Sequence, residues 1–386
     1  MRLCIVGGAL QGMEAVFLAN KAGYESVVID RRPEAPALSI CDEPHVIDVL
    51  KEPEKALDVL ESCDCVLPAI EELDVLGFLD RMLRGSSTDL LFDMHAYAVS
   101  QSKLESNRLM AECGVPLPGE WPGCGYPVVV KPSSQSGSIG VSVVHDDAEM
   151  EKALEVVRGL GDDPVVQEFV HGRSVSIEVI GDGTEAVPCV TTEVVLDEGY
   201  DCKQVDCFPC FLDDEDRRVL EECARRTAES LGLSAIMDVE AILTPKGLRF
   251  LEIDARIPSQ TPAAIWTATG VNLLEMLVRS RGHGIPACEP SGRSGIYWHL
   301  MLKDGVLRTT GEKEFSRVSE PVMESGLFGS DDSISDYSPR KKEWHGTFMV
   351  SGATPEEARS RRLSVIQAIM EECGVERFVD SVPKEA

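Results

Sequence analysis

Short apolar runs alternate with amphipathic stretches over the first hundred residues. The run 2–6 predicts a buried strand, a glycine-containing turn follows, and a helical pattern continues to about Ala22, where Gly23 ends it. Further strands are predicted at 26–29, 65–69 and 90–93, with helical stretches between them. Because alternating strands and helices are typical of a doubly wound fold, we predict a parallel sheet over about residues 1–95.

The pattern changes after residue 100. A helix is predicted over 105–113, and the segment 114–118 with its two prolines forms a stiff connector. Later strands are predicted at 128–130, 141–144, 165–167, 175–180, 237–243 and 248–253, with a helix over about 215–231. The Pro245-Lys246-Gly247 turn makes the last two strands a hairpin. The final hundred residues have a mixed α/β pattern without a motif.

Length and hydropathy predict a cytoplasmic protein with large cores. The chain has 386 residues and is 43% hydrophobic, which suggests two or three domains. No apolar run reaches the roughly 20 residues that cross a bilayer. The N-terminal segment leads directly into a strand and a glycine turn, unlike a signal peptide.

The formal net charge of −29 argues against nucleic acid or an anionic membrane as a partner, because phosphate would be repelled. The few basic residues of a nucleotide-binding protein of this kind would gather at the phosphates. The 13 cysteines are scattered, and Cys207 and Cys210 form a single Cys-x-x-Cys pair. A structural zinc site needs two further ligands, so we expect reduced thiols. The sequence predicts no oligomeric state.

The glycine turn at residues 7–12 has three interpretations. A dinucleotide-binding turn has glycine at the position of Ala9, and Asp30 lies where its ribose-binding acid would be. A dehydrogenase therefore remains one hypothesis. The others are a tight turn that binds nothing, and a turn whose N–H groups bind a small anion at a helix N-terminus.

Lys131 ends an apolar strand and precedes a loop rich in glycine and serine at residues 133–140. A lysine beside so many N–H and O–H donors suits a polyphosphate, although a surface lysine beside a hairpin would look the same. The extended segment 165–170 can offer backbone groups to an adenine edge, and Glu168 can accept ribose hydroxyls.

Acidic residues gather on both strands of the predicted hairpin. Because side chains alternate across a strand, Glu252, Asp254 and Arg256 share one face, and Asp238 and Glu240 share one face of the partner strand. Such carboxylates raise one another's pKa, and Mg²⁺ offsets this because it binds carboxylates and phosphates together. The donors of the arginine suit a carboxylate or a developing negative charge. An acidic edge strand in an acidic protein is the simpler alternative.

These motifs, and the order in which they follow one another along roughly residues 1–285, resemble those of the ATP-grasp ligases. The resemblance implies an α/β, ATP-grasp fold with an N-terminal Rossmann-like domain at 1–98, a small lobe with the phosphate loop at 99–170, and a large lobe with the metal site and a C-terminal extension at 171–386. It also implies ATP and two Mg²⁺ ions. The ATP-binding residues so implied are Lys103, Lys131, Ser138, Gln167, Glu168, Phe169 and Val170, and the metal ligands are Glu240, Glu252 and Asp254. Family members often have asparagine where Asp254 stands.

The segments Leu10-Gln11-Gly12 and Pro258–Pro262 are similar to those of the ATP-grasp ligases of pyrrolysine biosynthesis in particular. Those enzymes join the carboxylate of 3-methyl-D-ornithine to the ε-amine of L-lysine. The similarity implies that Leu10, Gln11 and Glu71 hold lysine, that Ser176, Ile177, Glu178, Asp238, Arg256, Ser259, Gln260 and Thr261 hold the ornithine part, and that Asp30, Asp48 and Val49 contact ATP. Ala9 stands where a lysine that contacts ATP is expected.

The catalytic residues implied by this resemblance are Lys131 and Arg256. The carboxylate would become an acyl phosphate, the lysine ε-amine would attack it, and Arg256 would stabilise the oxyanion while the loop 133–140 excludes water. Three other hypotheses remain open. They are an ATP-grasp ligase with a different substrate, a nicotinamide-dependent dehydrogenase built on residues 1–95, and a non-catalytic nucleotide-binding regulator.

Overall fold

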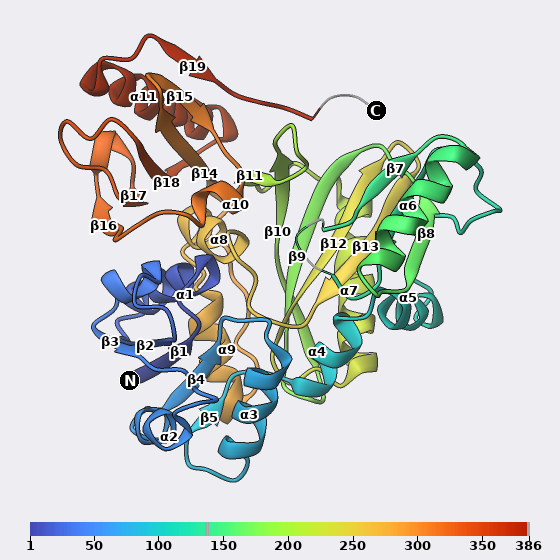
Figure 1. Ribbon diagram of the computed structural model, residues 1–386, viewed down its shortest axis with the longest axis horizontal. Coiled ribbons are helices and arrows are strands. Elements are labelled where there is room, and N and C mark those ends of the chain that lie inside the picture. The colour runs from blue at the N-terminus through green and yellow to red at the C-terminus, as the bar shows by residue number, and fades with distance from the viewer. Residues whose placement is uncertain (136, 138, 384–386) are drawn as a thin grey trace.

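Three β-sheets organise the chain in the computed structural model, which describes residues 1–135, 137 and 139–383. The N-terminal sheet lies apart from a central, strongly curved sheet, and a small sheet lies over one side of that central sheet (Figure 1). The predicted segments 1–98, 99–170 and 171–386 each contain one of these sheets.

The N-terminal sheet is parallel, with strand order β3-β2-β1-β4-β5. Its elements are β1 (Arg2–Val6), α1 (Leu10–Lys21), β2 (Glu25–Asp30), the 3-10 helix Pro36–Ser39, β3 (Glu43–Val46), α2 (Pro53–Glu61), β4 (Cys65–Pro68), α3 (Leu73–Leu83) and β5 (Asp89–Leu90). The predicted doubly wound sheet is confirmed. The predicted strand at 90–93 is wrong beyond Leu90, because Asp93 accepts hydrogen bonds from the N–H groups of His95 and Ala96 and begins a helix.

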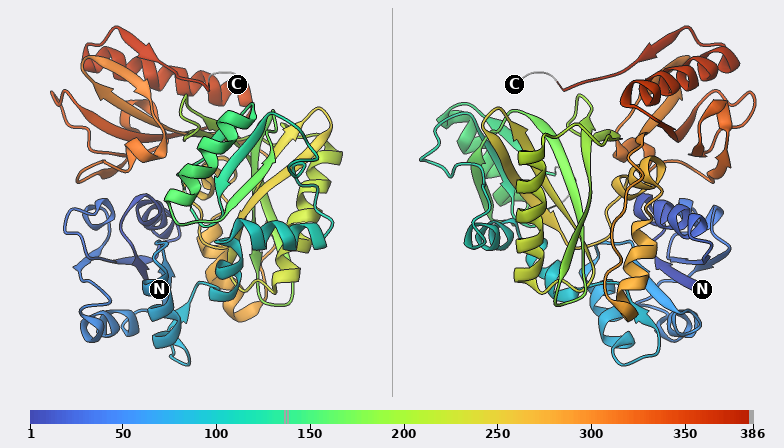
Figure 2. Two further views of the ribbon diagram at one scale, coloured as in Figure 1. Left: turned by 45° about the vertical axis from the view of Figure 1, so that its right-hand side comes forward. Right: turned by 180° about the vertical axis from the view of Figure 1, so that it is seen from behind.

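The small sheet is antiparallel, with order β7-β6-β8. Its elements, with the helices that precede it, are α4 (Met94–Ser100), α5 (Lys103–Glu112), β6 (Val128–Pro132), β7 (Ser142–Val144), α6 (Asp147–Gly159) and β8 (Pro164–Glu168). Val128, Val130 and Val144 pack against Met150 and Val157 of α6. One face of this sheet is therefore covered by its own helix, and the other faces the central sheet (Figure 2).

The central sheet runs in the order β13-β12-β9-β10-β11-β14-β18-β17-β16, and β15 and β19 extend it beside β14. Its elements are β9 (Arg173–Gly181), β10 (Ala186–Leu196), β11 (Cys202–Cys207), α7 (Asp214–Leu231), β12 (Ile236–Thr244), β13 (Gly247–Asp254), β14 (Ser294–Lys303), β15 (Val306–Thr309), α10 (Glu312–Phe315), β16 (Val322–Ser325), the 3-10 helix Leu327–Gly329, β17 (Asp332–Ser335), β18 (Trp344–Gly352), α11 (Pro355–Cys373) and β19 (Arg377–Val379). The predicted hairpin is β12 and β13.

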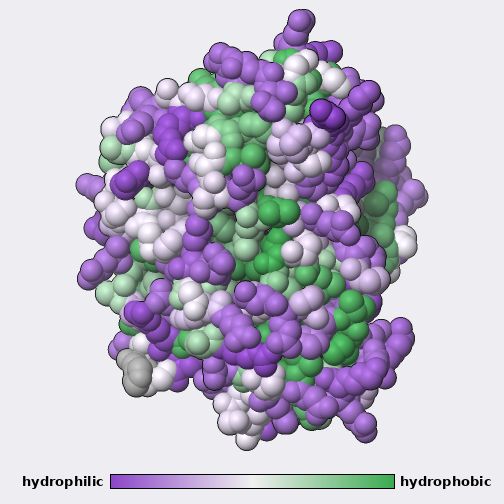
Figure 3. All heavy atoms as spheres, turned by 90° about the vertical axis from the view of Figure 1, so that its left-hand side faces the viewer, coloured by the Kyte–Doolittle hydropathy of each residue, from purple (hydrophilic) through white to green (hydrophobic). Residues whose placement is uncertain are grey.

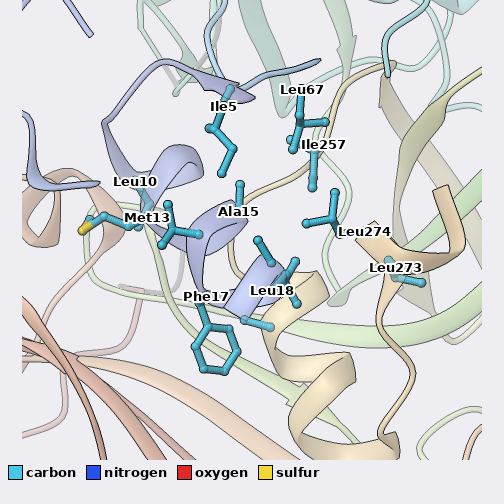
Figure 4. Packing of buried hydrophobic residues seen from close by; sticks show 14 of the residues in the cluster. Ile5, Leu10, Met13, Ala15, Phe17, Leu18, Leu67, Ile257, Leu273 and Leu274 are labelled. Atoms are coloured by element: carbon cyan, nitrogen blue, oxygen red, sulfur yellow. The ribbon is translucent and has the colours of Figure 1, made fainter. Parts of the chain in front are cut away.

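Helices α8 (Thr261–Thr269) and α9 (Leu273–His283) join the N-terminal sheet to the central sheet. Leu18 of α1 packs with Leu67, Ile257 and Leu274 in one buried cluster (Figure 4). That cluster also takes in Phe315 from the C-terminal region. The N-terminal domain and the C-terminal strands therefore share a core.

The surface agrees with the acidic composition. Hydrophilic side chains cover much of the face shown in Figure 3, with hydrophobic ones in patches between them. No helix within the described residues is long and apolar enough to cross a membrane. All thirteen cysteines, each in the described part of the chain, are free thiols, and Cys207 is buried while Cys210 is exposed.

Candidate active site

Polar side chains form a patch on one face of the central sheet. In the paired strands, Asp238 of β12 lies opposite both Glu178 of β9 and Asp254 of β13. Two residues further along β12, Glu240 lies opposite both Ser176 and Glu252. The residues between them, Ile177, Val239 and Ile253, pack on the other face in a core that includes Leu220 and Ala224 of α7. The predicted faces of the hairpin are thus confirmed, and β9 extends the patch.

Burial and mutual repulsion disfavour the charged forms of these acids. Burial raises the pKa of Asp238 to about 7. The hydrogen bond from the Ser176 hydroxyl opposes this shift, and the nearby carboxylate of Asp254 adds to it. Burial and the neighbouring Glu252 raise the pKa of Glu240. The pKa of Glu178 is also raised, first by burial and then by Asp238, with the Thr261 hydroxyl opposing the shift, and neither carboxylate oxygen has a partner of ordinary hydrogen-bond geometry among the described residues. Unpartnered buried carboxylates are costly, so a cation at this patch would be stabilised.

Two lysines face the patch from the side of the small sheet. Lys103, the first residue of α5, lies 3.2 Å from Glu252 Oε2 and donates to the Gln135 carbonyl at 2.8 Å. Lys131 of β6 donates to the Leu251 carbonyl at 3.4 Å. Burial lowers the pKa of Lys131, and Glu252 opposes that shift. The two predicted phosphate-binding lysines therefore meet at the predicted metal acids.

The predicted metal ligands Glu240, Glu252 and Asp254 lie on one face but do not form a preformed metal cluster. Among the described residues, no group of three or more His, Cys, Asp or Glu side chains is arranged to hold a metal ion. Glu252 is paired with Lys103 instead. Their chemistry fits Mg²⁺ all the same, because this ion commonly takes one or two protein carboxylates and completes its shell with phosphates and water.

Arg256 lies where the patch meets the N-terminal domain. Its Nη2 is 2.8 Å from Glu71 Oε1 and 3.3 Å from Asp254 Oδ2. With the amide oxygen of Gln11 turned toward it, Nε and Nη1 donate to that oxygen at 3.2 and 2.7 Å. Burial disfavours the charged guanidinium, but Asp254 and Glu71 raise its pKa above the usual range. Gln11 and Glu71, both predicted to hold a substrate, thus hold Arg256 in this structure.

The predicted ATP-binding set is divided between two places. Asp30, Asp48 and Val49 line a cavity of about 470 Å³ in the N-terminal domain, which Gln11 and Glu71 also line. Asp30 accepts the N–H of Gly8 at 2.7 Å, at the carboxyl ends of the parallel strands, where such sheets bind ligands. The remaining residues of the set belong to the small lobe. The cavity and the acidic patch meet at Gln11 and Glu71.

The predicted adenine-binding segment, Gln167 to Val170, follows β8. Gln167 is buried, whereas Glu168 turns its carboxylate to the N–H of Gly119 at 3.0 Å. The N–H of Phe169 donates to the Pro127 carbonyl at 3.1 Å. Glu168 therefore holds Gly119, the residue after the connector, through one carboxylate oxygen, and its exposed carboxylate has further acceptor capacity for the predicted contact with ribose. Ser138 lies outside the described residues.

Two predicted substrate-binding residues have side chains that belong to hydrophobic cores. Leu10 packs in the cluster of Figure 4, and Ile177 is fully buried beneath α7. Strand alternation points the Ile177 side chain away from Ser176 and Glu178. Only its backbone faces the patch.

The C-terminal region contributes a carboxylate that sequence analysis missed. Glu312 of α10 accepts from Ser259 Oγ and from Gln260 Nε2, both at 3.3 Å. Burial, more than the nearby Asp201, raises the pKa of Glu312. Glu14 of α1 accepts from the N–H of Gln260 and from the Tyr297 hydroxyl. No motif marks either acid, because both come from segments far from Ser259 in sequence.

Comparisons with known proteins fit this geometry. Residues 100–260 match the model of an ATP-grasp domain. The chain is 37% identical, over 93% of its length and 95% of the relative, to the 3-methyl-D-ornithine–L-lysine ligase of Methanosarcina acetivorans. The chain belongs to the ATP-grasp carboxylate–amine ligases.

Solved ATP-grasp structures have the same fold at low identity. The biotin carboxylase domain of a Hydrogenobacter thermophilus 2-oxoglutarate carboxylase, crystallised with MgADP, superposes with a TM-score of 0.74 at 15% identity, covering 95% of this chain and 89% of that one. An L-amino acid ligase from Bacillus licheniformis superposes with a TM-score of 0.66 at 16% identity, covering 95% and 97%. Membership of the ATP-grasp ligases replaces the dehydrogenase and regulator hypotheses. ATP-grasp enzymes bind ATP with Mg²⁺.

Proposed function

We propose that this ATP-grasp ligase joins the carboxylate of 3-methyl-D-ornithine to the ε-amine of L-lysine, releasing ADP and phosphate, as a step of pyrrolysine biosynthesis. The observation that carries the proposal is Glu178, a fully buried carboxylate beside Asp238 that has no hydrogen-bond partner of ordinary geometry among the described residues. Such a site favours an ammonium group, and a diamino acid supplies two. The near full-length relation to ligases of this specificity supports the same substrates.

Each group has a role in the proposed reaction. Lys103 and Lys131 would hold the phosphates of ATP, and Glu240, Glu252 and Asp254 would hold Mg²⁺, which when bound would offset negative charge at the site. Lys103 lies 3.2 Å from Glu252 Oε2 and has three N–H donors, so it can also donate to a phosphate oxygen. The ornithine carboxylate takes the γ-phosphoryl group and becomes an acyl phosphate, and the ε-amine then displaces phosphate. Arg256 donates to the oxyanion of this second step.

A coupled assay tests the proposal. Purified protein with ATP, Mg²⁺, L-lysine and D-ornithine is expected to release ADP only when both amino acids are present, and mass spectrometry is expected to find ornithyl-lysine. Nα-acetyl-lysine, whose ε-amine is free, is expected to replace lysine, whereas Nε-acetyl-lysine is not. Glu178→Gln is expected to raise the KM for D-ornithine while the KM for ATP stays the same.

Other outcomes would redirect the assignment. ADP release with other pairs of amino acids, but not with this one, would retain the ligase and reject these substrates. Product with Nε-acetyl-lysine would move the new bond to the α-amine.

A further inference from the structure

The segment Ser259–Gln260–Thr261, which enters the acidic patch, has an unusual backbone. Gln260 has φ 72° and ψ −55°, and the N–H of Thr261 donates to the Ser259 carbonyl at 2.8 Å. These values describe a γ-turn with a positive central φ, which is rare and strained for a residue with a side chain. Such conformations persist only where surrounding contacts determine them, and they concentrate at functional sites.

Buried contacts hold both the backbone and the side chain of Gln260. Its N–H donates to Glu14 Oε2, and Glu14 Oε1 accepts from the Tyr297 hydroxyl. Its side-chain Nε2 lies 3.1 Å from His299 Nε2, whose ring is fully buried. Burial lowers the pKa of His299 to about 3, so the ring is neutral, accepts at Nε2 and donates from Nδ1 to Thr347 at 2.6 Å.

The turn presents two hydroxyls to the site. Ser259 Oγ donates to Glu312 at 3.3 Å. Thr261 Oγ1 is buried beside Glu178 and has no partner of ordinary hydrogen-bond geometry among the described residues, but an interaction of its hydroxyl with Glu178 favours the charged form of that carboxyl and lowers its pKa. A change in the backbone at Gln260 would therefore move the group that lies beside the unpartnered acid of the patch.

Glu14 reaches this turn from the N-terminal domain. It lies three residues after Gln11 on α1, so both side chains project from one face of the helix. Gln11 contacts Arg256 and Glu14 contacts Gln260. We propose that Glu14 is a positioning residue, which holds the Ser259–Gln260–Thr261 turn in the shape that binds the amino-acid substrates. This inference rests on the proposed function of the acidic patch.

Two variants of Glu14 separate positioning from packing. Glu14→Gln keeps an oxygen that accepts the Gln260 N–H, and Glu14→Met fills a similar volume without an acceptor. Leu18→Ala, one helical turn further along α1 in the same core, creates a cavity and leaves the acceptor in place. Each variant is assayed for the KM of both amino acids and of ATP, and for Tm.

Glu14→Met is expected to raise the KM for at least one amino acid about tenfold, because the buried Gln260 N–H loses its acceptor and the turn is no longer held, with the KM for ATP unchanged. Glu14→Gln is expected to restore the wild-type KM, and Leu18→Ala to lower only Tm. If Glu14→Met does not fold, Glu14→Ala takes its place. Wild-type KM values in the acceptor-free variant, or an equal KM increase in Leu18→Ala, would overturn the inference. A wild type inactive with these amino acids would instead reject the proposed substrates before any variant is compared.

Discussion

At the scale of single residues, Arg256 is held by groups from two domains. Glu71 and Gln11 come from the N-terminal domain, and Asp254 from the central sheet. A guanidinium fixed on several sides needs little rearrangement to donate to a developing oxyanion. Lysine would keep the charge but not the fork of donors.

We expect Arg256→Ala and Arg256→Lys to lower kcat by roughly 10²-fold, the usual effect of losing an oxyanion donor, with a smaller change in the KM for ATP. Steady-state kinetics with both amino acids measures this. Arg249→Ala on the preceding strand, β13, is the matched control, because among the described residues Arg249 donates to its neighbour, the Leu248 carbonyl, and not to the acidic patch. An unchanged kcat in the Arg256 variants would assign that residue to substrate binding alone.

Glu14 makes stability depend on pH. Burial raises its pKa to about 8 from an ordinary 4.5, with Glu312 adding to the shift and the donors of Tyr297 and Gln260 opposing it. Between pH 4.5 and about pH 8, Glu14 keeps its proton in the folded chain and has lost it in the unfolded chain. This contribution to stability, on the order of a few kcal/mol, is fully present below pH 4.5 and is lost as the pH rises through about 8.

Thermal unfolding measures the effect. As the pH rises from about 5 to about 9, we expect the Tm of the wild type to fall relative to that of Glu14→Gln, whose side chain does not titrate. Parallel curves for the two proteins would show that Glu14 keeps an ordinary pKa.

At the scale of elements, sequence patterns predicted what is local. The alternation of side chains along a strand predicted that Asp238 and Glu240 share one face, and the turn at residues 245–247 predicted the hairpin of β12 and β13. The pairing of β12 with β9 joins segments about sixty residues apart, and no local pattern specifies that register. Ser176 and Glu178 entered the candidate site only through family resemblance. Glu14 and Glu312 were missed for the same reason, because tertiary packing alone brings them to Gln260.

The base of the predicted phosphate loop is hydrogen-bonded to the turn between α6 and β8. Ser134 donates to Asp162 from its N–H at 3.1 Å and from its hydroxyl at 2.6 Å. We expect Asp162→Ala to loosen the loop and admit water, so that acyl phosphate is hydrolysed and more than one ADP is released per product. Parallel assays of ADP and product give this ratio, with Asp163→Ala as the neighbouring control. A ratio that matches the wild type would mean that the loop base does not exclude water.

At the scale of the whole molecule, the C-terminal hundred residues are part of the structure that holds the site. Gln204 to Cys207 of β11 pair with β14, and Tyr297, Phe315, Val318, Ile334 and Met349 are buried in the core that includes α1, α8 and α9. Residues from this region also hold Gln260 and Ser259. The family resemblance seen in the sequence ended near residue 285, but the core does not end there.

A chain that ends at residue 285 is therefore expected not to fold. Burial of a large apolar side chain contributes about 2 kcal/mol, so the five named above contribute about 10 kcal/mol, comparable to the whole stability of a typical domain. The truncation would also leave β11 as an unpaired edge, which promotes aggregation. Solubility, far-UV circular dichroism and thermal unfolding, compared with the full chain, measure the outcome. A soluble, cooperatively unfolding 1–285 chain with ATP-dependent activity would mean that the C-terminal strands are a separate module, and that Glu312 is not required at the site.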